Sequence, residues 1–167
     1  TTGSNNTAMG SNSLSKITTQ GSNTAVGFGT LQSSTSGHSN VAIGAESQSA
    51  QVSGVNNTAV GYRSLWSTQS GSNNTAIGTN SCAQTTGNNN VGLGYFSLLN
   101  NTSGNKNAAI GSNALQYNTS GYENTALGYR ASTLNTEGYR NVAIGTDAAY
   151  SNQTGDYNIS IGYHANR

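Results

Sequence analysis

The sequence predicts an all-β fold, a β-solenoid in which the chain winds through about ten 17-residue coils. A unit of the form Asn-x-small-aliphatic-Gly occurs ten times in the 167 residues. Its asparagines recur with a constant period, as at Asn6, Asn23 and Asn40, except that the interval from Asn74 to Asn90 is one residue shorter. Of the 22 glycines, 20 fall into two columns with this period, and proline is absent. A fixed period of this kind outweighs local propensity in deciding a fold.

The coil is expected to consist of two short strands and two turns, without helices. A 17-residue unit is too short for the helix pairs of longer-period solenoids, and β-branched residues stand between turn formers. The first strand of each coil runs from the Asn of the unit to its Gly, as in Asn6 to Gly10. The one-residue deletion falls between Gly78 and Gly87, where a loop is expected to absorb it.

Successive side chains along that strand point to opposite faces. The residue after Asn, often Thr or Val, shares a face with the aliphatic residue before Gly, as Thr24 does with Val26. We expect this face to form the core. The opposite face carries tiny residues such as Ala25, and we expect another subunit to approach closely there; the alternative is a tight turn inside the same coil.

The segment after the Gly adds a column of small residues and then a column that is often Leu, such as Leu31 and Leu65. Cys82 stands in the Leu column, and no His or acid recurs near it in register. A buried thiol is therefore expected there rather than a nucleophile.

Composition excludes several classes of function. Charged residues make up 7% of the chain, the net charge is +1, and the six Lys and Arg are scattered, which argues against nucleic-acid partners. No apolar run approaches the ~20 residues needed to span a bilayer. The five acids form no recurring pair, so we expect no enzyme activity, no metal and no cofactor.

Ten coils at the ~4.8 Å strand spacing span about 43 Å. One aliphatic pair and part of a Leu per coil make a thin core against the entropy of ordering the whole coil. Sharing the core among several chains would solve this problem.

These repeats resemble the head domains of YadA-type trimeric autotransporter adhesins, whose repeats carry Asn-Ser-Val-Ala-Ile-Gly followed two residues later by Ser. The segment from Asn40 through Gly44 to Ser47 is the closest match. Similar repeats occur in phage and viral tail fibres. The resemblance covers every coil and implies a left-handed parallel β-roll that assembles as a homotrimer. The coils here are longer than is usual for the family, which favours a viral or phage fibre and implies longer outer loops.

By analogy with the family, one column of asparagines is expected to be structural, bonding turn backbone and stacking along the rod. Its members are Asn6, Asn23, Asn40, Asn57, Asn74, Asn90, Asn107, Asn124, Asn141 and Asn158. Residues 1–167 are expected to be one domain, a segment of a longer extracellular fibre or adhesin on a virion or a bacterial surface. Its expected role is host or surface attachment through a face that binds a host glycan or protein.

Aromatic residues suggest where such a face lies. The residue after the unit Gly alternates between small and aromatic, and exposed rings about 9.6 Å apart could stack on sugars. The alternative is that each ring packs over its small neighbour or fills a groove between subunits. A second cluster of tyrosines enriches the C-terminal half. The candidate ligand surface comprises Tyr62, Tyr95 and Tyr129 from the alternating column with Tyr122, Tyr139 and Tyr157 from the cluster.

Ice binding is the alternative function, because a flat solenoid face with a column of Thr resembles antifreeze solenoids. The candidate array is Thr7, Thr24, Thr58, Thr75 and Thr125, and apolar residues interrupt it. These interruptions favour a packed column over an ice-binding one.

Overall fold

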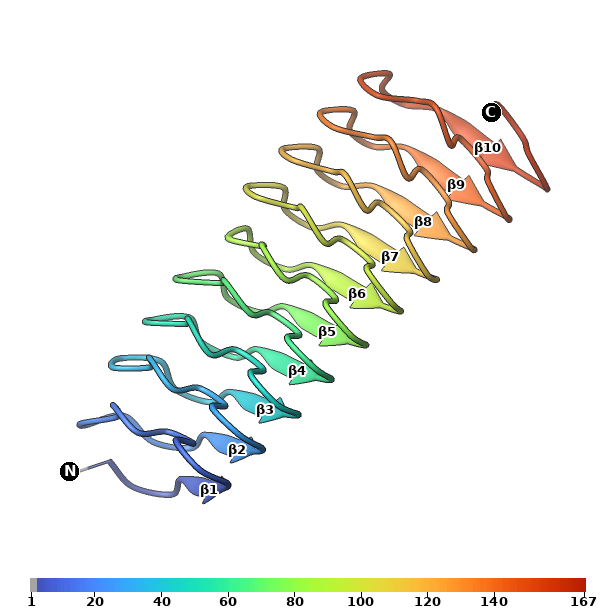
Figure 1. The fold of residues 1–167 in the computed structure, drawn as a ribbon. Coiled ribbons are helices and arrows are strands. Elements are labelled where there is room, and N and C mark those ends of the chain that lie inside the picture. The colour runs from blue at the N-terminus through green and yellow to red at the C-terminus, as the bar shows by residue number, and fades with distance from the viewer. Residues whose placement is uncertain (1–2) are drawn as a thin grey trace.

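The computed structural model describes residues 3–167 and shows an all-β parallel solenoid of about nine turns (Figure 1). Within these residues it contains ten strands of three residues and no helix. The first two residues of the predicted domain lie outside the described part. The strands are β1 (Thr7–Met9), β2 (Thr24–Val26), β3 (Val41–Ile43), β4 (Thr58–Val60), β5 (Thr75–Ile77), β6 (Val91–Leu93), β7 (Ala108–Ile110), β8 (Thr125–Leu127), β9 (Val142–Ile144) and β10 (Ile159–Ile161).

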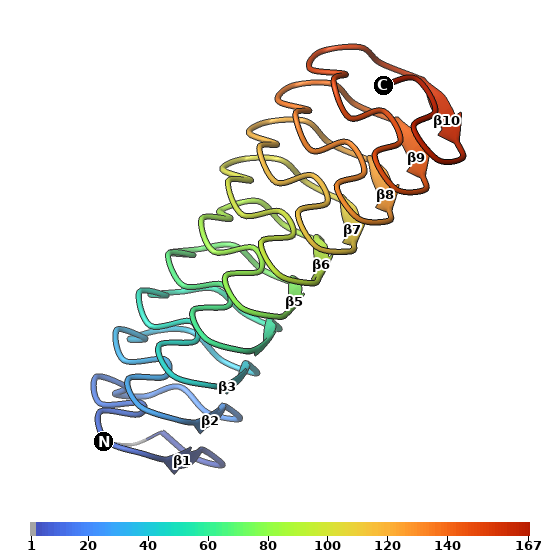
Figure 2. The ribbon, with the colours of Figure 1, turned by 45° about the vertical axis from the view of Figure 1, so that its right-hand side comes forward.

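The strands form one parallel sheet in chain order, and each pairs with the strand of the next coil. Equivalent residues of the repeat lie opposite one another, as Thr24 does opposite Val41. The register survives the shortened coil, because Thr75 of β5 still pairs with Val91 of β6. The deletion is therefore absorbed in the loop, as predicted. The strands β1 and β10 lie at opposite ends of the rod (Figures 1 and 2).

The predicted second strand of each coil is wrong. The corresponding segment is a continuous turn, in which two residues per coil take positive φ, for example Glu46 at 57° and Gln48 at 50°. These left-handed residues interrupt the extended backbone that a strand requires. Hydrogen bonds between coils nevertheless continue through the turn, since Leu31 N donates to Ser47 O at 3.1 Å and Gln48 N to Ser64 O at 3.0 Å.

The predicted orientation of the strands is also wrong. The tiny residues at their centres point into the coil and are fully buried, as Ala25, Ala42 and Ala59 are, so they do not meet another subunit. The flanking Thr and aliphatic columns face outward. The prediction that the Leu column is buried is confirmed by the complete burial of Leu31 and Leu65.

The narrowness of the coil explains this inversion. At Gly92, the central residue of β6, an added Cβ would lie 2.5 Å from Cys82 Sγ and 2.7 Å from Ser81 Oγ. The space between the strand and the facing turn therefore holds a methyl group at most, and interiors tolerate overpacking poorly. Larger aliphatic side chains have room only outside.

Asparagine side chains run through the interior as a ladder. In each of the nine steps, the backbone N of one Asn donates to Oδ1 of the Asn in the preceding coil, as Asn40 does to Asn23 at 3.0 Å. In every step except the last, whose donor is Asn158, the Nδ2 of the donor Asn also donates to a backbone carbonyl of the next coil, as Asn40 does to Gly54 O at 2.9 Å. A column of buried amides thus satisfies backbone groups that the turns leave unpaired.

No helix within the described residues is both long and apolar enough to cross a membrane.

Candidate functional site

The exposed face of the sheet carries two parallel columns. The column before the unit Gly is aliphatic, and Ile43, Ile77 and Leu127 are 40, 44 and 44% exposed. The column after the Asn holds the candidate ice-binding threonines, which are exposed or half-buried: Thr7, Thr24, Thr58, Thr75 and Thr125. Because the pairing is parallel and in register, both columns follow the length of the rod.

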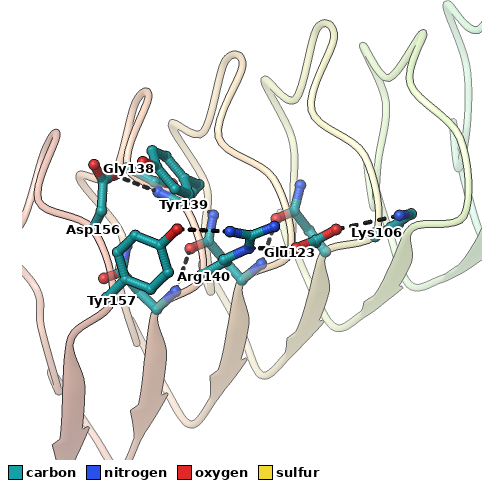
Figure 3. A network of polar contacts seen from close by, with 10 residues as sticks. Lys106, Glu123, Gly138, Tyr139, Arg140, Asp156 and Tyr157 are labelled. Atoms are coloured by element: carbon teal, nitrogen blue, oxygen red, sulfur yellow. Dashed lines mark hydrogen bonds and ion pairs between the residues drawn. The ribbon is translucent and has the colours of Figure 1, made fainter.

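Charged and aromatic side chains form a second surface, in the turn that leads into the strands (Figure 3). Glu123 accepts from Lys106 Nζ at 3.2 Å and from Arg140 Nε at 2.8 Å. Arg140 Nη1 donates to Tyr157 Oη at 2.6 Å. The four residues occupy the same position in successive coils, immediately before the Asn of the ladder, so each reaches its neighbour one coil away.

These contacts shift the pKa values of Glu123 and Arg140. Hydrogen bonds from Arg140 and then Lys106 lower the pKa of the Glu123 carboxyl, and the bond to Glu123 followed by that to Tyr157 raises the pKa of Arg140. Glu123 therefore stays ionised to lower pH than an isolated glutamate.

The neighbouring column of the same surface is aromatic. Tyr122 and Tyr139 stack with ring centroids 4.7 Å apart and planes 3° apart, and Tyr139 meets Tyr157 edge-on at 5.3 Å. Asp156 Oδ1 accepts from the backbone N of Tyr139 at 3.0 Å. The Tyr139 ring is thus engaged by neighbouring tyrosines from both adjacent coils, which leaves less of its surface for contact with a ligand.

A third surface begins after the strands. Tyr62, Tyr95 and Tyr129 follow β4, β6 and β8, and they are 42, 50 and 49% exposed. Phe28 and Tyr163 belong to the same column, and they are 54 and 75% exposed. Within a single chain the rings are not covered by the small residues of the coils between them.

The six candidate tyrosines therefore belong to two surfaces. One set precedes the strands and the other follows them, so the strands and their exposed face lie between the two sets. The expectation of one ligand surface across both sets would need a ligand that spans the sheet face.

The residue after each of the four tyrosine rings that follow the strands packs on that ring. Arg63 Cζ lies 5.1 Å from the Tyr62 ring centroid, and Arg130 Cζ lies 5.7 Å from that of Tyr129. Phe96 stacks on Tyr95 and His164 on Tyr163, each pair with centroids 3.9 Å apart. These four partners come from a single column of the repeat, two positions after the unit Gly.

Carboxylates in the same column pair with the basic side chains among these partners. Glu46 Oε2 lies 2.6 Å from Arg63 Nε, and Asp147 bridges Arg130 at 3.1 Å and His164 at 3.2 Å. The bonds to the tyrosines, that to Tyr150 first, raise the pKa of Arg130, and Asp147 adds to the effect.

Sequence reasoning missed these charged ladders, although their signal was present. Lys106, Glu123 and Arg140 are spaced by one repeat, as are Glu46 with Arg63 and Arg130 with Asp147. Reading each charge by its position in the repeat would have paired them, because neighbouring coils place equivalent residues side by side.

Cys82 is fully buried, which confirms the expectation of a buried thiol. Burial raises its pKa to about 12, against a smaller opposing effect of the hydrogen bond that Ser81 donates. The thiolate form that a nucleophile requires is therefore scarce at neutral pH.

Comparison with known proteins gives no match to this chain among protein-family models, curated proteins or solved structures.

Proposed function

We propose that this chain is a structural and adhesive segment of a homotrimeric extracellular fibre, of a virus or phage or of a bacterial surface adhesin. In this role it holds a receptor-binding surface away from the particle or cell and serves host or surface attachment. The observation that carries the proposal is the aliphatic column, exposed on the sheet along the rod. We further propose left-handed winding of the coils, on the resemblance to YadA-type heads.

The exposed column supports self-assembly because its contacts repeat at every coil. A partner that covers it along its length must present groups at the same spacing, about 4.8 Å. A second copy of this chain meets that requirement without further adjustment. Side chains such as Ile77 and Ile110, 44 and 40% exposed in one chain, would then be buried between copies.

The interior supports the same proposal. Within the described residues, the column that carries the Asn ladder is polar throughout, and the buried centres of the strands hold only Ala, Gly or Ser. The free energy of folding that such a coil gains from apolar burial is small. Covering the outer aliphatic column would add the missing burial, and three parallel copies would present each ligand surface three times, which raises avidity.

Ice binding is a second candidate, favoured by one observation. The Thr column faces outward on a parallel sheet instead of packing in the core, so its hydroxyls are available along one flat face. The homotrimer buries this face, whereas ice binding requires it to be exposed.

Light scattering on the purified chain tests the proposal. We expect a mass three times that of the 17.0 kDa chain, stable to dilution. The variant Ile110→Asp places a charge on the aliphatic column and should reduce the mass to that of one chain. Val52→Asp is the matched control, because Val52 is also 40% exposed but lies in an outer loop.

A wild-type chain that stays monomeric would overturn the homotrimer. Faceted ice crystals growing in its presence, and their loss in the variant Thr75→Tyr, would then establish the ice-binding function. A trimer that leaves ice growth unchanged excludes it.

A further inference from the structure

We propose that the row of aromatic side chains after alternate strands, Phe28, Tyr62, Tyr95, Tyr129 and Tyr163, binds an extended, uncharged β-linked polysaccharide. This inference names the ligand class of the proposed attachment surface and so rests on the proposed function. The row is hereafter the aromatic row.

The first observation that supports this ligand is that the rings have open faces. The ring of Tyr95 has Phe96 stacked on it at 3.9 Å, and Arg63 lies 5.1 Å from the Tyr62 centroid. Although a neighbour packs on each of these rings, Tyr62 and Tyr95 remain 42 and 50% exposed. The neighbour holds the ring in place while much of its surface stays open, and a fixed aromatic surface is what a sugar ring stacks on.

The spacing of the row carries the second step. Successive rings are two coils apart, about 9.6 Å, because the coils between them have Ala45, Thr79, Ser112 or Thr146 at the same position. In a fully extended β-linked chain, sugars alternate in orientation, so every second sugar presents the same face at a similar repeat. A polymer of this shape can place one sugar on each ring without bending.

Polar side chains carry the third step. The residue after each small residue is Asn12, Glu46, Asn80, Asn113 or Asp147. Of these side chains, Asn12 is exposed and Glu46 and Asn80 are half-buried, so they can form hydrogen bonds with sugar hydroxyls. Asp147 and the Asn113 Oδ1 atom are buried and do not contribute. Aromatic surfaces combined with a few placed polar groups are typical of small-ligand recognition.

Charge favours a neutral polymer. The two arginines beside the rings are paired, Arg63 with Glu46 at 2.6 Å and Arg130 with Asp147 at 3.1 Å. The aromatic row therefore presents neighbouring charges of both signs instead of the cation cluster that a polyanionic glycan would need.

Calorimetry with cellohexaose and chitohexaose tests the inference, with maltohexaose as a control of different chain shape. We expect binding of at least one β-linked oligosaccharide and none of maltohexaose. The affinity should increase from cellobiose to cellohexaose, because longer chains reach more rings. This length dependence is measured on the wild-type protein and needs no variant.

Substitutions then locate the site. Tyr95→Ala and Tyr129→Ala should each weaken binding about two- to tenfold, the loss of one stacked aromatic contact, and Tyr129→Phe should retain it. Tyr117→Ala is the matched control, since Tyr117 is 44% exposed and Tyr129 49%, but it lies outside the row. Equal loss in the control would overturn the inference, as would wild-type binding of maltohexaose.

Light scattering on the same samples separates this inference from the proposed function. A trimer that binds no β-linked oligosaccharide overturns the ligand and leaves the assembly standing. A monomer that binds one overturns the assembly alone. If Tyr95→Ala or Tyr129→Ala reduces the mass of the assembly, the row is a contact between copies of this chain, and the ligand assignment fails.

Discussion

The two halves of the rod share one backbone but fill one interior column differently. In most coils this pre-glycine column lies three residues before the glycine that precedes the Asn of the repeat unit. Through the β5 coil it holds Ile17, Ser34, Gln51, Thr68 and Thr85. From the β6 coil onward it holds Asn101, Asn118, Asn135 and Asn152. Both series are buried except for the half-buried Asn152.

The difference lies in hydrogen bonding. In the C-terminal half, Asn118 Nδ2 donates to Asn101 Oδ1 at 2.6 Å, and Asn135 Nδ2 donates to Asn118 Oδ1 at 2.7 Å. In the N-terminal half, the hydroxyls of Ser34 and Thr68 have no hydrogen-bond partner within residues 3–167. Asn101, Asn118 and Asn135 thus link three successive coils, and the row ends at Asn135, whose Oδ1 has no partner within the described residues. A buried polar column stabilises the fold where its side chains bond to the next coil, which the Ser34 and Thr68 hydroxyls do not do.

The largest expected effect comes from breaking the C-terminal ladder. Asn118→Ala removes bonds to Asn101, Asn135 and the Gly121 carbonyl and leaves the Asn101 Oδ1 without a partner. We expect the free energy of unfolding to fall by about 2–4 kcal/mol, measured by urea denaturation.

Ser34→Ala is the control in the N-terminal half. It removes a hydroxyl that has no partner within the described residues, so the free energy of unfolding should change by less than about 0.5 kcal/mol. Equal losses for the two variants would show that the halves do not differ.

The next largest loss of stability is expected from a substitution at the junction between the halves. Gly92→Ala places a methyl group against Cys82 Sγ and Ser81 Oγ, and we expect a loss of about 1–2 kcal/mol in the free energy of unfolding. Cys82→Ala in the same chain should recover part of this loss in thermal denaturation, because it removes the atom that the methyl group meets. Purely additive effects of the two substitutions would contradict the contact.

Thr68→Val, in the N-terminal half, is expected to stabilise the chain. It replaces a buried hydroxyl that has no partner in the described part of the chain by a methyl group, so the free energy of unfolding should increase by about 1 kcal/mol. In the C-terminal half the hydroxyl of the buried Thr133 has two acceptors within reach for its one proton, Asn113 O at 2.9 Å and Arg130 O at 2.8 Å. Thr133→Val should therefore destabilise the chain, and a gain in both variants would refute the assignment.

The smallest effect concerns the charged ladder of Lys106, Glu123 and Arg140 in the C-terminal half. Because the pKa of Glu123 is lowered on folding, its contribution to stability is present above the ordinary pKa of about 4.3 and is lost as the pH falls through the lowered value. NMR titration of the Glu123 carboxyl should give a midpoint below the ordinary glutamate value of about 4.3. Arg140→Gln should raise the Glu123 midpoint, and an unchanged midpoint would mean that the bond does not persist in solution.

The repeat itself determined much of this protein. Its constant period predicted the solenoid, the in-register pairing and the loop that absorbs the deletion near Thr85, since equivalent residues of a solenoid must stack. The burial of the Leu column and of Cys82 was also predicted correctly, although the same argument from apolar character failed for the aliphatic column.

Only the tertiary structure decided which face of each strand points inward. Alternation separates Ala25 from Thr24 and Val26 but does not say which side is the core, and hydrophobicity alone points to the wrong one. The width of the coil decides, because the turn that faces the strand leaves space for a methyl group at most. The same packing places the aliphatic column on the surface.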